Sequence, residues 1–291
     1  MSSTLQKWKG VAYHQRLRLY AKARRALLPQ RAFALVGDTD IGPMAVSIDD
    51  MEVSRRLLEQ GSWEQAEVQR ILKLLCAEDR VLVVGGHIGS LAIPIARHCA
   101  ELKVIEANPE TFRLLRINLL LNHSDNVEAL NFAANDTGGS LRFLNSRINS
   151  GGAKREPKVA RRGYTYDNPE VIEVPAFVLD EKFAGQAFDA VIMDIEGSEY
   201  YALKGGQKVL ASARMLVVEF LPHHLKYVAS VGPREFAELL VPHFGAMYIP
   251  GTGRTILRDD IIPTLVQMYE RDMEDDGLIF VKDPAQLELI R

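Results

Sequence analysis

The stretch Val81-Leu-Val-Val-Gly-Gly-His-Ile-Gly-Ser90 determines how the rest of the chain can fold. Its four leading apolar residues predict a fully buried parallel strand. Gly85, Gly86 and Gly89 follow, and glycine lets the backbone turn sharply and approach a ligand closely. An apolar helix then begins near Leu91, and helix N-termini favour anionic groups. This order predicts a nucleotide site at the first crossover of a doubly wound sheet, although α/β proteins without a ligand there share the pattern.

Strand and helix patterns alternate after this stretch. A second strand ends at Glu106, and Asn108 and Pro109 then occupy the N-cap and first position of a helix. Further strands are expected over 127–132, 140–144, 171–178, 188–194, 215–220, 246–249 and 278–281, with a long polar loop over 145–170. Repeated βα units before a terminal antiparallel pair predict a Rossmann-like α/β fold, a mostly parallel, doubly wound, seven-stranded sheet with an antiparallel edge hairpin.

The segment before this domain has a different composition. Residues 1–80 are predicted to form an N-terminal helical cap, and 81–291 to form the nucleotide-binding domain. A basic amphipathic helix is expected over 5–30, and it either docks on a membrane surface or partner or packs on the main domain. We favour packing through Val11, Leu17, Leu19 and Leu27. Ser62-Trp-Glu-Gln65 has the pattern of a capping box for the next helix.

Composition limits the classes of function. The chain has 291 residues, 47% of them hydrophobic, and a net charge of -3. This net charge provides no global basic field for a nucleic-acid partner. The basic charge is concentrated at the N-terminus: residues 1–31 carry eight Lys and Arg and no acid, and the remainder carries -11. Cys76 and Cys99 lie in apolar contexts and are expected to be buried thiols in a reducing compartment. No apolar run has the length of a membrane span and no hydrophobic signal core appears, so a cytoplasmic location is expected.

Two features narrow the nucleotide. Glu106 lies 21 residues after Gly85, where a carboxylate can accept hydrogen bonds from both ribose hydroxyls. The glycines over 85–90 have neither the G-x-G-x-x-G register nor the Gly-Lys-Ser/Thr of a P-loop. A nucleoside cofactor without phosphates, such as S-adenosylmethionine, is therefore favoured. The alternative role for Glu106 is a helix-entry carboxylate beside Asn108.

A second group of polar residues follows the strand over 188–194. Asp194, Glu196 and Glu199 stand at its exit, on the edge of the sheet where ligands bind. Carboxylates concentrated there are costly unless they bind donors, a cation or a proton in transit.

The chain resembles the FkbM family of S-adenosylmethionine-dependent methyltransferases over roughly residues 50–282. The resemblance rests on five motifs, matched here by 83–89, 105–110, 193–199, 203–205 and 275–281. It departs from the family at Val83, His87 and Met193. The resemblance implies a class I methyltransferase that transfers a methyl group to a hydroxyl of a small sugar or natural-product molecule.

Methyl transfer to a hydroxyl requires a base, and polar residues at the exits of the strands are the candidates for it. The catalytic candidates are Asp194, Glu196 and His223, with His224 expected to face solvent. Asp194 could instead hold the methionine amino group, and Glu196 or Glu199 could cap the following helix. The residues expected to bind the cofactor are Gly85, Gly86, His87, Gly89, Ser90, Glu106, Ala107, Asn108, Ala134, Asn135, Asp136 and Asp194. Asp194, Glu196, Glu219 and His223 offer donors to a metal, but their spacing is not determined, so no metal is predicted.

The sequence of the loop over 145–170 is compatible with two roles, and it does not identify the acceptor substrate. Its basic residues and tyrosines, among them Lys154, Tyr164 and Tyr166, either close as a lid over an anionic or glycosidic substrate or form a solvated loop. Competing functions are N-methylation of a similar scaffold, a nucleotide-dependent oxidoreductase and a non-catalytic binding module. A homodimer is compatible with the sequence, and no nucleic-acid partner is expected.

Overall fold

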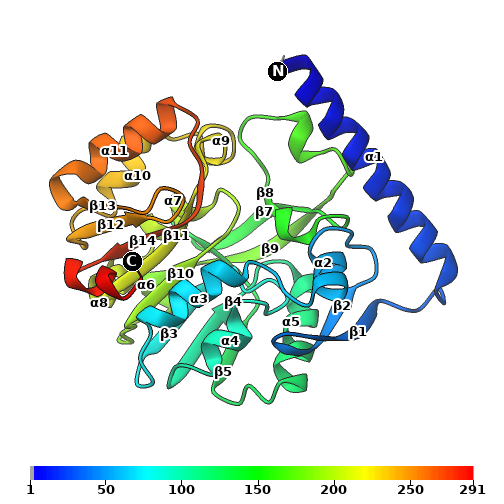
Figure 1. Ribbon diagram of the computed structural model, residues 1–291, viewed down its shortest axis with the longest axis horizontal. Coiled ribbons are helices and arrows are strands. Elements are labelled where there is room, and N and C mark those ends of the chain that lie inside the picture. The colour runs from blue at the N-terminus through cyan, green and yellow to red at the C-terminus, as the bar shows by residue number, and fades with distance from the viewer. Residues whose placement is uncertain (1–2, 291) are drawn as a thin grey trace.

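The computed structural model describes the backbone of residues 3–290 and the side chains of residues 13 and 15–290. Its centre is an eight-stranded sheet in the order β13-β12-β14-β11-β10-β3-β4-β5 (Figure 1). The parallel strands are β3 (Arg80–Val84), β4 (Glu101–Ile105), β5 (Val127–Leu130), β10 (Ala190–Met193) and β11 (Met215–Phe220). The antiparallel strands are β14 (Asp275–Val281), β12 (Ala246–Ile249) and β13 (Arg254–Leu257).

The doubly wound α/β fold is confirmed, with one correction to the number of strands. The sheet has eight strands rather than seven, because β13 pairs with β12 and extends the antiparallel edge. The helix α11 (Arg258–Glu270) follows β13 directly.

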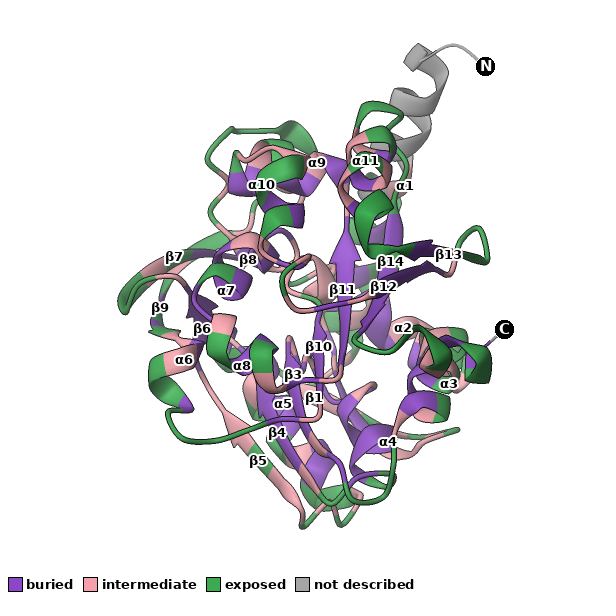
Figure 2. Ribbon diagram, turned by 90° about the vertical axis from the view of Figure 1, so that its left-hand side faces the viewer, coloured by how far each residue is buried: buried purple, intermediate pink, exposed green. Residues whose placement is uncertain are grey.

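Each face of the sheet carries its own hydrophobic core. In β3, Leu82 and Val84 pack into one core while Val81 and Val83 pack into the other, as strand geometry requires. The first core is covered by α6 (Leu179–Lys182), α7 (Glu199–Lys204), α8 (Gln207–Ser212), α10 (Pro233–Glu238) and α11. The second is covered by α2 (Val53–Gln60), α3 (Gln65–Leu74), α4 (Ala92–Ala96), α5 (Pro109–Leu121) and η4 (Pro284–Ile290). Figure 2 shows the central strands buried between these layers.

A second, four-stranded sheet stands beside the first. Its order is β6-β9-β7-β8, with bounds β6 (Ala133–Asn135), β7 (Gly139–Asn145), β8 (Lys154–Arg155) and β9 (Glu170–Val178). The strands expected over 140–144 and 171–178 are therefore confirmed. The predicted loop contains β8 and two short 3-10 turns, η1 (Ser150–Gly152) and η2 (Arg162–Tyr164).

The N-terminal segment consists of the helix α1 (Ser3–Leu27) and a hairpin of β1 (Ala34–Thr39) and β2 (Gly42–Ser47). Leu17 packs with Ala21 and Met51, as part of the packing that we favoured. The expectation was wrong for Leu19 and Leu27, which are 66% and 86% exposed because they lie on the outer face of the helix. The side chain of Val11 lies outside the described residues.

Local helix signals gave mixed results. Asn108 caps α5 by accepting a hydrogen bond from Glu110 N at 3.0 Å, as predicted. The capping box at Ser62 is wrong, because the residue before α3 is Glu64 in a left-handed conformation without a side-chain cap. Cys99 is buried, but Cys76 is exposed, contrary to prediction. Among the described residues, no helix combines the length and apolarity needed to cross a membrane.

Candidate active site

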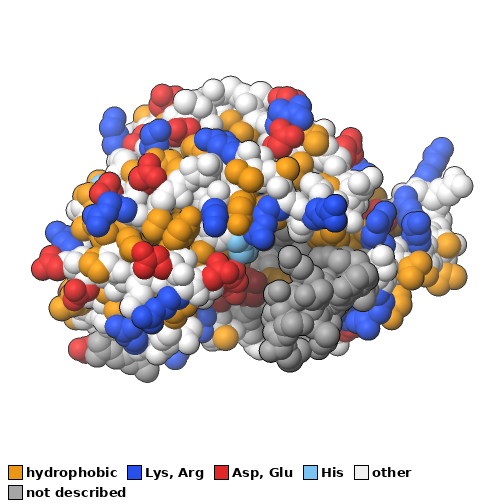
Figure 3. Space-filling model, turned by 90° about the horizontal axis from the view of Figure 1, so that it is seen from above, with side chains coloured by type: hydrophobic (Ala, Val, Ile, Leu, Met, Phe, Trp, Pro, Cys, Tyr) orange, Lys and Arg blue, Asp and Glu red, His pale blue; other side chains and the backbone are white. Residues whose placement is uncertain are grey.

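A cavity of about 430 Å³ opens at the carboxyl ends of β3, β4 and β10. Its floor is formed by strand ends and the glycine loop, and its roof by Tyr13 and Leu17 of α1, by residues 52–53 and by residues 149–151. Figure 3 shows acidic side chains gathered near the centre of the face seen from above. Cavities of this size are typical of small-molecule and cofactor sites.

The glycine loop is held between β4 and β10. Backbone N–H groups of Gly85 and Gly86 donate to Ile105 O at 2.9 and 2.8 Å. Gly85 has φ +99°, and a Cβ atom there would lie 1.7 Å from the carbonyl oxygen of Asp194. Only glycine fits this position, so the loop brings the exits of both neighbouring strands within reach of one ligand.

Glu106 lies at the end of β4 with both carboxylate oxygens oriented. His87 N donates to one oxygen at 2.8 Å and Asn108 N donates to the other at 2.7 Å. Burial raises the pKa of Glu106 to about 7, an effect that the backbone hydrogen bonds reduce. Each carboxylate oxygen can accept a further hydrogen bond, and the residue lines the cavity.

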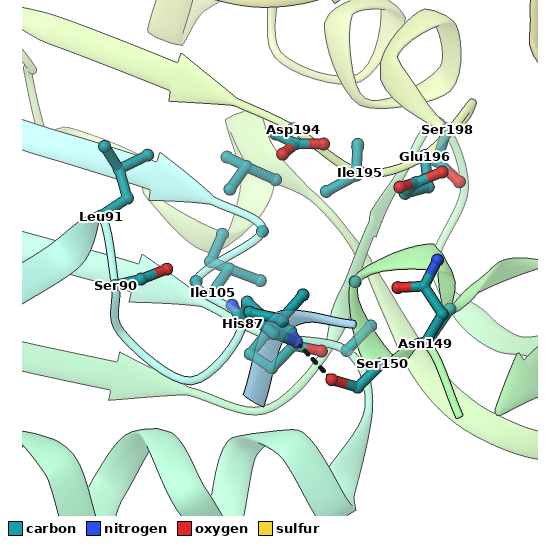
Figure 4. Close-up of a pocket in the computed structure, with 18 of the residues that line it drawn as sticks. His87, Ser90, Leu91, Ile105, Asn149, Ser150, Asp194, Ile195, Glu196 and Ser198 are labelled. Carbon is teal, nitrogen blue, oxygen red and sulfur yellow. Dashed lines mark hydrogen bonds between the residues drawn. The ribbon is translucent and has the colours of Figure 1, made fainter. Parts of the chain in front are cut away.

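Three carboxylates converge at the ends of β10 and β11. Oxygens of Asp194, Glu196 and Glu219 lie within 4.8 Å of one another. Asp194 opens into the cavity, and its pKa is raised well above its usual range by burial and by the negative charge of Glu196. Figure 4 shows Asp194 and Glu196 following each other along the cavity wall.

Lys154 neutralises part of this cluster from behind. Its Nζ donates to Glu196 Oε2 at 2.7 Å and lies 3.1 Å from His224 Nε2. The sequence placed Lys154 in a lid or a solvated loop, but its side chain is only 7% exposed, because β8, the edge strand of the second sheet, places it against Glu196 and His224. Tyr166 is the one member of the predicted basic and aromatic lid that lines the cavity, within the described residues.

The two histidines after β11 are reversed relative to prediction. His224 is buried, with Nδ1 3.3 Å from Glu219 Oε2, and burial lowers its pKa. His223 lies outside the cavity lining, and its Nδ1 is 2.8 Å from the hydroxyl of Tyr164. The reversal follows from α9 (Pro222–His224), whose first turn directs His224 inward.

Glu199 has a structural role in the turn after β10. Its two carboxylate oxygens accept hydrogen bonds from Ile195 N and Gly197 N, both at 2.9 Å. These contacts hold the turn in which Glu196 adopts φ +55°, and they are not the predicted helix cap, because both donors precede α7 and its N-cap Ser198 makes no side-chain cap hydrogen bond.

The expected cofactor residues divide into two groups. Those that line the cavity are Gly85, Gly86, His87, Ser90, Glu106, Ala107, Ala134 and Asp194, and those that do not are Gly89, Asn108, Asn135 and Asp136. Apart from Gly89, which has no side chain, the residues of the second group have other partners. Asn108 forms a hydrogen bond with Asn145, Asn135 forms one with Thr137, and Asp136 pairs with Lys204 at 2.9 Å.

Sequence reasoning missed the acidic wall opposite the glycine loop. Glu52, Glu64 and Glu67 line the cavity together with Trp63. Burial and the neighbouring charge of Glu64 raise the pKa of Glu67 to about 8. Among the described residues, the lining contains six carboxylates and neither Lys nor Arg. A signal existed in the acids at position 64, just before α3, and at position 67 within it, but nothing in the sequence indicated what that helix faces.

The protein has a doubly wound sheet, with a glycine loop after β3 and an acid, Glu106, at the end of β4. This arrangement is typical of nucleoside-binding α/β proteins. The model of the methyltransferase FkbM domain matches residues 84–244. The chain therefore belongs to the FkbM methyltransferase family, which uses S-adenosylmethionine.

Solved structures with similar folds are distant. The M. jannaschii protein TYW2, solved in complex with AdoMet, is 14% identical with a TM-score of 0.37, over 66% of this chain and 64% of that chain. An M. jannaschii tRNA m1G37 methyltransferase is 14% identical with a TM-score of 0.44, over 88% and 59%. A precorrin 8W decarboxylase from Methanobacterium thermoautotrophicum is 12% identical with a TM-score of 0.40, over 76% and 89%.

This chain spans about three-fifths of the length of the first two structures. No protein with a curated description shows significant similarity to it.

Proposed function

We propose that this protein transfers the methyl group of S-adenosylmethionine to a hydroxyl of a small sugar or natural-product molecule. The observation that supports this most is the placement of Glu106 and Asp194 on either side of the glycine loop in one cavity. A ribose-binding acid and a second acid for the cationic end of the cofactor are then one loop apart.

The cavity residues fit this cofactor. Gly85 and Gly86 carry no side chain between the backbone and the ligand, and Glu106 offers two oxygens to the ribose hydroxyls. Phe132 and Ala134 form an apolar wall suited to an adenine ring. When bound, S-adenosylmethionine supplies an electrophilic methyl carbon on a sulfonium.

A hydroxyl acceptor must lose its proton as the new bond forms. Asp194 and Glu196 are the candidates that line the cavity, whereas His223 does not line it. We assign the role of general base, which accepts the hydroxyl proton, to Asp194. Burial and the charge of Glu196 raise the pKa of Asp194 toward the range useful for a base at neutral pH. The alternative role of Asp194, holding the methionine amino group, leaves Glu196 as the base. A positioned base typically contributes about 10²–10⁴-fold.

The lining also bears on the acceptor class. Six carboxylates without a lining Lys or Arg, within the part of the chain that is described, would repel phosphate groups. This supports a small, uncharged acceptor and argues against nucleic acid. The same carboxylates favour a cationic amine, so N-methylation of a similar scaffold is the second candidate.

The test begins with calorimetric titration of S-adenosylmethionine, its demethylated product, NAD and ATP. We expect the first two to bind, and a free ligand concentration of ten times Kd should raise the free energy of unfolding by about 1.4 kcal/mol. Binding of NAD alone would overturn the proposal. Isotopic methyl transfer to matched hydroxyl and amine compounds then separates the two acceptors. Cytoplasmic location, a homodimer and the division at residue 80 stay predictions.

A further inference from the structure

A buried carboxylate that the proposed reaction does not use lies behind the cavity wall. Asp50 precedes α2 and is fully buried. One of its oxygens accepts hydrogen bonds from Glu52 N at 2.7 Å and Val53 N at 3.1 Å. The other accepts the hydroxyl proton of Ser150, which belongs to η1 in the roof. A charged group in such a place is costly, so its partners indicate what it orients.

Ser150 continues this chain of hydrogen bonds to the glycine loop. Its Oγ lies 2.8 Å from His87 Nε2, the contact drawn as a dashed line in Figure 4. Asp50, Ser150 and His87 are far apart in sequence and come from three different segments. His87 and Ser150 both line the cavity. His87 is also a departure of this chain from the family motif.

Proton counting assigns the state of the His87 ring. The Ser150 hydroxyl has a single proton, which it donates to the Asp50 carboxylate. The short contact to His87 then requires Nε2 to carry the ring proton and to donate it to Ser150 Oγ. Burial lowers the pKa of His87 to about 4, so the ring is neutral at pH 7. Nδ1 is left with its lone pair, and within the described residues no hydrogen-bond partner is found for it.

We propose that Asp50 and Ser150 are positioning residues that keep His87 as the neutral Nε2–H tautomer, with an unprotonated nitrogen available to the sulfonium end of S-adenosylmethionine. This rests on the proposed function and deepens it. A lone pair near the sulfonium favours the charged cofactor over its neutral-sulfur product. The opposite tautomer would present an N–H to the same cation and disfavour it.

The experiment measures Kd for S-adenosylmethionine and for S-adenosylhomocysteine by calorimetry at pH 7.5 in the full chain. Asp50→Asn and Ser150→Ala should each weaken S-adenosylmethionine about tenfold, the scale of one hydrogen bond to a charged group, and the product by less than about threefold. The matched control is Asp79→Asn, a buried carboxylate before β3 that bonds Cys76 N at 2.7 Å, at the opposite end of the strand. It should leave the ratio of the two affinities unchanged.

The proposal would be overturned if the variants weakened both ligands equally or left both affinities unchanged. A merely structural role changes both affinities together. Ser150→Ala keeps the test available if Asp50→Asn does not fold, because Asp50 also binds the turn before α2. Imidazole ¹⁵N–¹H spectra at pH 7.5 give an independent measurement. An Nε2–H resonance for His87 in the wild-type protein is expected, and an Nδ1–H tautomer or an imidazolium would overturn the assignment.

A wild-type protein that binds neither ligand would instead contradict the proposed function. The ¹⁵N spectra would still report the tautomer in that case, so the two failures can be told apart.

Discussion

The end of β4 and the paired ends of β10 and β11 both place carboxylates beside the cavity, but they stabilise them differently. Glu106 is held by the backbone N–H groups of His87 and Asn108, both within 20 residues of it. Asp194, Glu196 and Glu219 lie together and depend on Lys154, which comes from a different sheet. Nearby residues of the chain therefore orient Glu106. In the cluster at the ends of β10 and β11 the carboxylates repel one another, and a cationic ligand would reduce that repulsion.

The largest effect is expected where the two regions touch. Gly85→Ala puts a Cβ atom against the backbone carbonyl of Asp194 at a positive φ. We expect the free energy of unfolding to fall by about 4 kcal/mol, from strain together with the displaced strand exit. Urea unfolding followed by circular dichroism measures it. Gly139→Ala is the control, because Gly139 has φ +125° with open space around it and should cost about 1 kcal/mol. Equal losses would mean that the contact between the regions is unimportant.

The next prediction concerns the β10–β11 end alone. Lys154→Met removes the buried cation beside the clustered carboxylates of Asp194, Glu196 and Glu219 and should lower the free energy of unfolding by about 3 kcal/mol at pH 7.5. The raised pKa values of Asp194 and Glu219 mean that these groups gain protons as pH falls, so the loss should be smaller at pH 5.5. Lys204→Met removes an exposed ion pair and should cost below about 1 kcal/mol. A loss that does not change with pH would show that packing, not charge, is the role of Lys154.

At the β4 end the expected effect is smaller and depends on pH. The pKa of Glu106 is raised by burial to about 7 in the folded protein, above its unfolded value. The folded state therefore binds more protons between about pH 4.5 and 7, so this residue's contribution to stability is present at low pH and is lost as pH rises. We expect the wild-type protein to lose about 2 kcal/mol more than Glu106→Gln over this range. Urea titrations at three pH values measure the difference, and parallel pH profiles would contradict it.

The same contrast explains what could be predicted from sequence. Buried strands, the Asn108 cap and the place of Glu106 depend on residues close in the chain, and the structure has them where the patterns indicated. The contacts of Lys154 with Glu196 and His224, and those of Ser150 with Asp50 and His87, join segments more than 40 residues apart. No local pattern encodes such contacts, because they arise only when the second sheet and the roof pack on the first sheet.

Asp136 gives the smallest expected effect and defines where the β4 region ends. The sequence placed it among the residues expected to bind the cofactor, but its carboxylate pairs with Lys204 at the surface and does not line the cavity. Asp136→Ala should change Kd for S-adenosylmethionine by less than about twofold, and the free energy of unfolding by at most about 1 kcal/mol, as expected for a pair near the surface. Calorimetry on the variant, beside Glu106→Gln as a positive control, makes the comparison. A tenfold loss of affinity would extend the cofactor site past Ala134 to the exit of β6, and the nucleoside end would then also depend on the second sheet.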